Sequence, residues 1–317
     1  MSEVARQQSL KKSRAARNWK MSVTMAWPGT RFLPPTPRAK RWVEKAVAPG
    51  AEVVRVRRLS GGTASAVHAV DVRVPSGTTL RLVLRRHLLF NSLQEDPDLA
   101  EREARNLQLL ERAGISAPRL VAVDPNGAEC DVPAVLMTRM PGQLELKPGD
   151  LDLWLRRMAE LLPPIHAIDP TPFHVQEWQI WDDLRKLDVP AWSSRPEVWR
   201  QLIDIVRGPW PSFRPRFVHR DFQHYNVLWS RGRPTGVLDW DSASMGPVEL
   251  DHNHFRYNLL DFGFEVAERF SGIYGEVTGE DPNPFWEALN FAPGPPRSEF
   301  QRETLDRFAA SLLAKLG

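Results

Sequence analysis

The chain of 317 residues is long enough for one large domain or for a two-lobed unit with an ample core. Hydrophobic residues make up 42% and charged residues 26%, as in an ordinary soluble protein, and no run approaches the roughly 18 apolar residues of a membrane helix. We therefore expect no membrane partner, and the single cysteine, Cys130, excludes an internal disulfide and favours a cytoplasmic location.

Residues 1–35 are predicted to form a basic, disordered tail without the apolar core of a signal peptide. Residues 1–20 contain six lysine or arginine side chains against Glu3 alone, whereas the whole chain has a net charge of only +3. The rest of the chain is therefore slightly acidic, which makes nucleic acid an unlikely partner of the body. Binding of nucleic acid through the tail is a separate hypothesis, and it predicts steep salt dependence and loss on deletion of residues 1–20.

Residues 36–140 are predicted to form an amino-terminal, nucleotide-binding lobe with an antiparallel sheet and one main helix. β-rich runs that are separated by Gly- and Pro-containing turns are typical of such a meander. In the main helix, Leu99, Glu103 and Leu107 share one face by their spacing. The expected elements are helices at 38–47 and 98–113 and strands at 52–58, 66–74, 80–86, 119–123 and 134–138.

Residues 141–317 are predicted to form a mostly helical, catalytic and substrate-binding lobe. The fold class that follows is α+β, with two lobes. Helical patterning covers 151–168, 196–207, 248–272 and 298–315, and a short β region lies at 217–219, 226–230 and 236–240.

Three side chains of this β region have the chemistry of a phosphoryl-transfer site. Asn226 follows Asp221 by five residues, Asp239 comes thirteen residues later, and the turn sequence 231–235 predicts a hairpin that brings Asn226 near Asp239. A carboxamide and a carboxylate suit Mg²⁺, with substrate phosphates completing its coordination. Asp221 would accept or orient a proton from a hydroxyl nucleophile. Each residue taken alone is also an ordinary turn former, but the joint spacing favours a site.

The run from Phe217 to Trp229 resembles the catalytic loop of the aminoglycoside phosphotransferase/choline kinase family, and the run from Gly236 to Ala243 is similar to its metal-binding strand. The resemblance covers residues 36–275 and includes the helix that follows Gly246-Pro247. It implies a protein-kinase-like fold, with Asp221 as catalytic base, Asn226 and Asp239 as metal ligands, and His219 as a structural support of the loop.

The amino-terminal lobe offers an independent expectation. Arg85 aligns with the phosphate-pairing lysine of kinases, and an arginine can grip phosphate with two donors. Glu103 lies on the apolar face of its helix, where an unpaired carboxylate is costly, so Arg85 is its expected partner. A surface role for Arg85 is the alternative.

Further nucleotide contacts are assigned by position. Gly61, Gly62 and Thr63 join two strands where a kinase covers the phosphates, although the loop departs from the G-x-G-x-x-G pattern and a Gly-Gly hairpin turn also explains it. Thr138 and Met140 lie on the segment expected to pass the adenine.

The function expected from these residues is a small-molecule kinase that uses ATP and Mg²⁺, with GTP not excluded and a small hydroxyl-bearing compound as acceptor. A catalytically silent nucleotide- or small-molecule-binding protein of the same fold is the alternative. The acceptor stays open, because one fold serves many acceptors.

Overall fold

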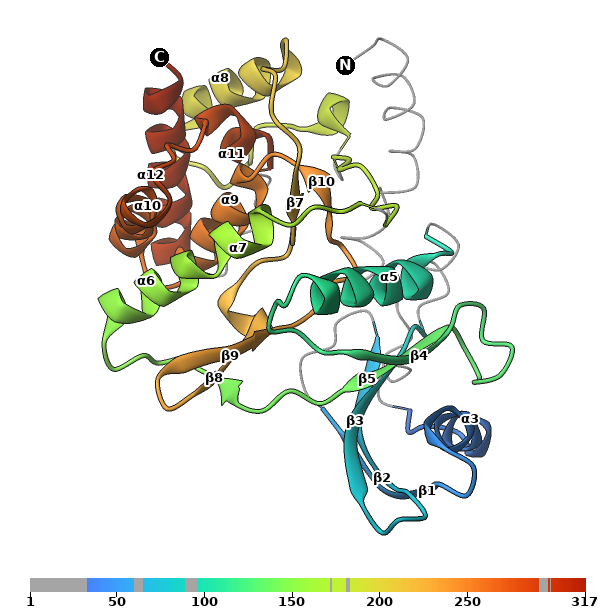
Figure 1. Ribbon diagram of the computed structural model, residues 1–317. Coiled ribbons are helices and arrows are strands. Elements are labelled where there is room, and N and C mark those ends of the chain that lie inside the picture. The colour runs from blue at the N-terminus through green and yellow to red at the C-terminus, as the bar shows by residue number, and fades with distance from the viewer. Residues whose placement is uncertain are drawn as a thin grey trace.

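A five-stranded antiparallel sheet forms one end of the molecule in the computed structural model, which describes residues 33–59, 65–88, 96–171, 173–180, 183–290, 296 and 298–317 (Figure 1). Its strand order is β1-β2-β3-β5-β4. The strands are β1 (Glu52–Arg58), β2 (Ala66–Arg73), β3 (Thr79–Arg86), β4 (Leu120–Asp124) and β5 (Ala134–Thr138), and two helices, α3 (Pro37–Val47) and α5 (Leu99–Arg112), accompany them. These elements are called the sheet lobe below.

The two faces of this sheet carry different helices because side chains alternate along each strand. Leu84 on β3 is buried in a cluster with Trp42 of α3. Val135 on β5 is buried in a second cluster with Leu107 of α5, and Val83 packs against that cluster. Arg85 therefore projects toward α5, which lies between the sheet and the rest of the molecule (Figure 1).

The other end of the molecule is mainly helical and is called the helical lobe below. Its amphipathic segments bury one stripe each, as Trp199, Leu202 and Val206 do in α8. The helices are α6 (Leu151–Glu160), α7 (Leu162–His166), α8 (Pro196–Arg207), α9 (Glu249–Leu259), α10 (Phe264–Thr278), α11 (Pro284–Asn290) and α12 (Glu299–Leu316). Among the helices described, none combines the length and apolar character needed to cross a membrane.

Two segments that were each predicted to form one helix form two helices instead. The segment 151–168 divides at Leu161, since Pro163 and Pro164 have no backbone N–H to continue the first helix and instead occupy the start of α7. The segment 248–272 divides at Gly263, whose φ of 118° is incompatible with a continuous helix. Helix α11 was not predicted.

Two small sheets lie between the sheet lobe and the helices. One pairs β7 (Arg216–Val218) with β10 (Ser244–Gly246), which was not predicted, and the other has the order β6-β8-β9, with β6 (Gln143–Leu144), β8 (Val227–Ser230) and β9 (Arg233–Val237). The hairpin of β8 and β9 is confirmed, but its turn is shorter than predicted. Arg231 and Gly232 have φ of 50° and 69°, as a two-residue turn requires, so the second strand begins three residues early and ends before Asp239.

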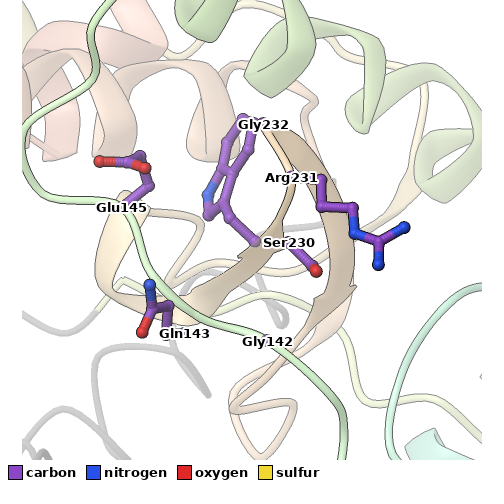
Figure 2. Close-up of a pocket in the computed structure, with 7 residues that line it drawn as sticks. Gly142, Gln143, Glu145, Ser230, Arg231 and Gly232 are labelled. Carbon is purple, nitrogen blue, oxygen red and sulfur yellow. The ribbon is translucent and has the colours of Figure 1, made fainter.

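A pocket of about 250 Å³ opens beside this hairpin (Figure 2). It is lined by Gly142, Gln143, Glu145, Trp229, Ser230, Arg231 and Gly232. Asp221, Asn226 and Asp239 do not line it, so this pocket is separate from the candidate catalytic and metal-binding residues.

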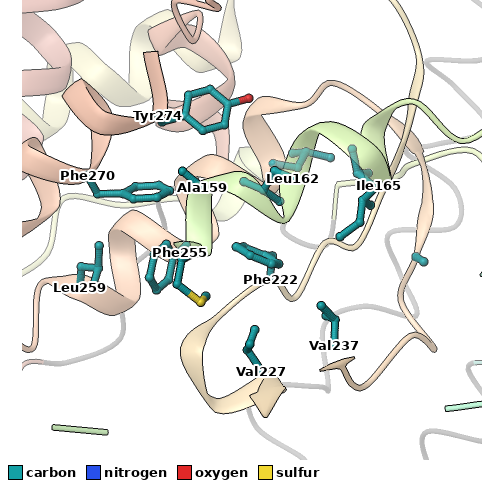
Figure 3. Packing of buried hydrophobic residues seen from close by; sticks show 14 of the residues in the cluster. Ala159, Leu162, Ile165, Phe222, Val227, Val237, Phe255, Leu259, Phe270 and Tyr274 are labelled. Carbon is teal, nitrogen blue, oxygen red and sulfur yellow. The ribbon is translucent and has the colours of Figure 1, made fainter. Parts of the chain in front are cut away.

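Buried apolar side chains of the helical lobe hold the loop between β7 and β8 in place. Phe222 is fully buried and its ring meets that of Phe255 edge-on, with 5.8 Å between centroids (Figure 3). Val227 and Val237, opposite each other in the hairpin, are buried in the same cluster. The loop between β7 and β8 is thus anchored by apolar side chains in its middle, at Phe222, and at its end, where β8 begins with Val227.

A buried ionic cluster joins α9, α10 and α11. Arg256 is fully buried and donates to Glu287 at 2.6 Å and to Glu268, while His252 Nδ1 lies 2.7 Å from Glu287. Burial by itself raises the pKa of Glu287, but His252 and Arg256 lower it to about 2. Folding therefore favours the ionised carboxylate.

Replacing Glu287 by glutamine is expected to lower the free energy of unfolding by about 3 kcal/mol at pH 7, since Arg256 loses a buried partner. The pKa of this carboxyl is lower in the folded chain than in the unfolded one. Its contribution is therefore complete above the unfolded pKa near 4.5 and is lost as the pH falls toward about 2. Urea unfolding at pH 7, 4.5 and 3 measures this, with the exposed Glu303→Gln as control. An equal loss at pH 3 and pH 7 would contradict it.

Candidate active site

The loop that carries Asp221 is held by a buried carboxylate on α9. Asp251 is fully buried, and it accepts from the backbone N–H of His219 at 2.9 Å and of Arg220 at 2.6 Å. Its third donor is His166, at 2.9 Å. Arg220 has φ of 72°, a conformation that non-glycine residues adopt only when their surroundings impose it. Asp251 provides that constraint, and sequence reasoning gave it no role.

The carboxylate of Asp221 accepts three hydrogen-bond donors. Gln223 Nε2 donates to Oδ1 at 2.8 Å, His254 Nε2 lies 2.8 Å from the same oxygen, and Asn226 Nδ2 donates to Oδ2 at 2.9 Å. Burial raises the pKa of Asp221, but His254, His219 and Asn226 outweigh it and leave the pKa below its usual value. The side chain keeps 28% of its surface exposed, so solvent and small molecules can reach this carboxylate.

His219 uses both ring nitrogens on the backbone. Its Nδ1 accepts from the N–H of Asp221 at 3.2 Å, and its Nε2 lies 2.8 Å from the carbonyl oxygen of Leu238. This pattern assigns the proton to Nε2. The imidazole thus ties the Asp221 loop to the segment before Asp239, which is the supporting position that the sequence suggested.

Asn226 and Asp239 come together where the hairpin opens. The backbone N–H of Leu238 donates to the carbonyl oxygen of Asn226 at 2.7 Å. The Nδ2 group of Asn226 is bound to the carbonyl and carboxylate of Asp221, both at 2.9 Å, which leaves its Oδ1 as the free oxygen. Asp239 has φ of 68°, and burial together with the nearby Asp241 raises its pKa to about 7, against the effect of Arg85.

Arg85 connects the sheet lobe to Asp239. Its Nη1 donates to Glu103 at 2.8 Å and to Asp239 at 2.6 Å, and its Nη2 donates to Asp241 at 2.7 Å. The predicted ion pair with Glu103 is therefore present, and Glu103 is only 2% exposed. Burial raises the pKa of Glu103, but Arg85 and His87 lower it overall. Asp241 was missed, although its spacing from Asp239 around the buried Trp240 could have indicated that both carboxylates face one way.

The other residues that were predicted to bind the nucleotide make no contact that links them directly to Asp221, Asn226 or Asp239 in the described part of the chain. Gly61, Gly62 and Thr63 lie outside the described residues, and Ser65, just beyond them, accepts from Arg85 Nε at 3.2 Å. Thr138 ends β5, and its hydroxyl accepts from the N–H of Arg119 at 2.9 Å. The side chain of Met140 packs against Gly236, and a Cβ at that glycine would clash with Met140 Cε, so the methionine side chain would have to move.

The oxygens of Asn226 and Asp239 suit a magnesium ion that is also bound by phosphates and water better than a metal ion held by protein side chains alone. Within the described part of the chain, no group of three or more His, Cys, Asp or Glu side chains could hold a metal ion. Mg²⁺ in phosphoryl-transfer sites takes one or two protein oxygens and completes its octahedron with phosphates and water. The Oδ1 of Asn226 and the carboxylate of Asp239 are two oxygens that would suit such an ion.

The known proteins to which this chain is similar are phosphotransferases and kinases. The family model described as "Phosphotransferase enzyme family" matches residues 55–288. A stretch of 71 residues, 22% of this chain and 21% of the relative, is 40% identical to N-acetylmuramate/N-acetylglucosamine kinase of Neisseria meningitidis serogroup B, so the match spans about a fifth of that protein.

Two solved structures have the same kinase-like fold. The aminoglycoside phosphotransferase APH(4)-Ia, solved as a thermostable mutant in a ternary complex with ADP and hygromycin B, is 16% identical, and the alignment covers 87% of this chain and 98% of that chain with a TM-score of 0.57. A macrolide 2'-phosphotransferase of type I is 18% identical over 90% and 95% of the two chains, with a TM-score of 0.55. The two-lobed α+β fold is thereby shown.

Proposed function

Because the chain belongs to the phosphotransferase enzyme family, we propose that it is a kinase that uses ATP and Mg²⁺ to phosphorylate a hydroxyl group of a small molecule. The observation that carries the proposal is the convergence of Asp221, Asn226 and Asp239 with the Arg85–Glu103 pair. These groups come from β3, α5 and the two segments that flank the hairpin, so a hairpin with ordinary turn residues does not explain the arrangement.

Asp221 acts as the base in this proposal. Its Oδ2 oxygen accepts one donor, Asn226, and has a lone pair for the proton of the acceptor hydroxyl. As the acceptor oxygen forms its bond to the γ-phosphorus, the proton passes to Asp221 and the bond to ADP breaks.

Asn226 and Asp239 would hold Mg²⁺, which neutralises the charge on the phosphates when it is bound. Arg85 would bind phosphate oxygens, and Glu103 would hold its guanidinium in place. Since Arg85 also contacts Asp239 and Asp241, one side chain connects the phosphate-binding and metal-binding groups.

Replacing Glu103 by glutamine is expected to raise the KM for MgATP about 10- to 100-fold, the equivalent of one charge-assisted hydrogen bond. The KM for the acceptor should change little, because Glu103 lies in the sheet lobe. Steady-state ADP release measures both constants. Glu101→Gln is the matched control, since Glu101 is exposed on the same helix. An unchanged KM for MgATP in Glu103→Gln would contradict the role.

The acceptor class can be approached from the partial relative. That relative is named as a kinase of N-acetylmuramate and N-acetylglucosamine, so we propose a sugar hydroxyl as the first acceptor to test. A panel of sugars, amino sugars, aminoglycosides, macrolides and choline, assayed for ADP release above the rate with water, tests this. Turnover of choline alone would contradict a sugar acceptor and leave the kinase proposal standing.

A catalytically silent binding protein is the second candidate. The observation that favours it is the direct contact between Arg85 and Asp239, at 2.6 Å, which satisfies the carboxylate without a metal ion. Calorimetric binding of ATP without ADP release on any acceptor of the panel would support it. Ordinary turnover would eliminate it.

A further inference from the structure

Helix α9 contacts the catalytic loop at two places. Asp251 binds the backbone before Asp221, and His254, three residues later on the same helix face, reaches the Asp221 carboxylate itself. His254 Nε2 lies 2.8 Å from Asp221 Oδ1, and both side chains are 28% exposed. No local sequence pattern indicates a catalytic role for His254.

The two oxygens of Asp221 have different partners. Oδ1 accepts Gln223 and His254, whereas among the described residues Oδ2 accepts Asn226 alone. A half-turn about the Cβ–Cγ bond only exchanges the two oxygens and restores these contacts, but a smaller turn moves the accepting oxygen away from His254 and Gln223. The donors therefore fix the plane of the carboxylate and with it the direction in which the oxygen beside Asn226 presents its lone pair.

We propose that His254 is a positioning residue that donates its Nε2–H to Asp221 Oδ1 and holds the plane of the carboxylate, so that the other oxygen faces the acceptor hydroxyl. The proposal rests on the proposed function of Asp221 as base. The effect of His254 falls on kcat, because a misdirected carboxylate still allows substrates to bind but seldom meets the hydroxyl in a reactive geometry.

Two substitutions separate hydrogen bonding from packing. His254→Phe keeps an aromatic ring and removes the donor, and it is expected to lower kcat about 10- to 100-fold with little change in either KM. His254→Gln places an amide N–H near the former Nε2 and is expected to recover most of the lost rate. His174→Phe, at an exposed histidine, is the matched control. The assay is ADP release from MgATP with the best acceptor of the panel, or with water if none is found.

The hydrogen bond itself is tested without any substrate. In ¹⁵N-histidine NMR spectra of the full chain, we expect an Nε2–H signal that disappears in His254→Gln and shifts in Asp221→Ala. Absence of that signal overturns the proposal, as does an equal loss of kcat in His254→Phe and His254→Gln, which would indicate packing alone. If Asp221→Ala keeps the wild-type rate, or the wild-type protein releases no ADP, the proposed function fails and the role of His254 falls with it.

Discussion

Asp221→Asn is expected to lower the kcat for ADP release by about 10²- to 10⁴-fold, the usual contribution of a positioned general base. Asparagine keeps the shape of the side chain but has no charge to accept the proton. The KM for MgATP should stay within a few-fold of wild type, since Asn226 and Asp239 remain. Stopped-time assays of ADP and of phosphorylated product measure the loss.

The control for this variant is Asp281→Asn, at an exposed aspartate of the helical lobe. Thermal unfolding of both variants should match wild type to within a few degrees, so that a fall in rate is not a fall in folded protein. Wild-type turnover by Asp221→Asn would rule out the aspartate as the base and leave the fold assignment untouched.

Asp239→Asn is expected to remove the response to Mg²⁺. For the wild-type protein, a ligand at 100 times its Kd adds about 2.7 kcal/mol of stability, which appears as a higher Tm in MgATP than in ATP with a chelator. The variant should show the same Tm in both conditions and should lose ADP release by about 10²-fold or more, since neutralisation of the phosphates depends on this carboxylate.

The matched comparison is Asp131→Asn. Asp131 pairs with Arg86 at 2.6 Å on the opposite face of the sheet, so this variant also removes an arginine–carboxylate contact. It should keep the full Mg²⁺ response whatever its effect on stability. A Tm shift by Mg²⁺ that persists in Asp239→Asn would assign the ion to other ligands.

The elements of the sheet lobe were predictable because their signals are local. Strand bounds at β1 and β5 follow from β-rich runs between turn residues, and Glu103 stands out as a carboxylate on an apolar helix face. A buried charge requires a partner, so the pair with Arg85 followed from burial and strand alternation. The domain bounds 1–35, 36–140 and 141–317 stay a prediction.

The residues that sequence reasoning missed depend on tertiary contacts. Asp251 and His254 lie on one helix, about thirty residues after the loop they bind, and nothing in their local pattern distinguishes them from polar residues of a solvent-facing stripe. The start of β9 also escaped, because the two-residue turn at Arg231-Gly232 uses φ > 0 at a residue that is not glycine. Local patterns give periodicity and turns, but not which side chains meet.

The most direct measurement of the central claim follows the phosphoryl group itself. The wild-type protein and Asp221→Ala are incubated with [γ-³²P]ATP and Mg²⁺ in the presence of the acceptor panel, and labelled products are separated from ATP and free phosphate. We expect a labelled phosphomonoester that forms with the wild-type protein, needs Mg²⁺ and is absent with Asp221→Ala. Transfer at the same rate by both proteins, or ATP binding by the wild type with no labelled acceptor in the whole panel, would contradict it.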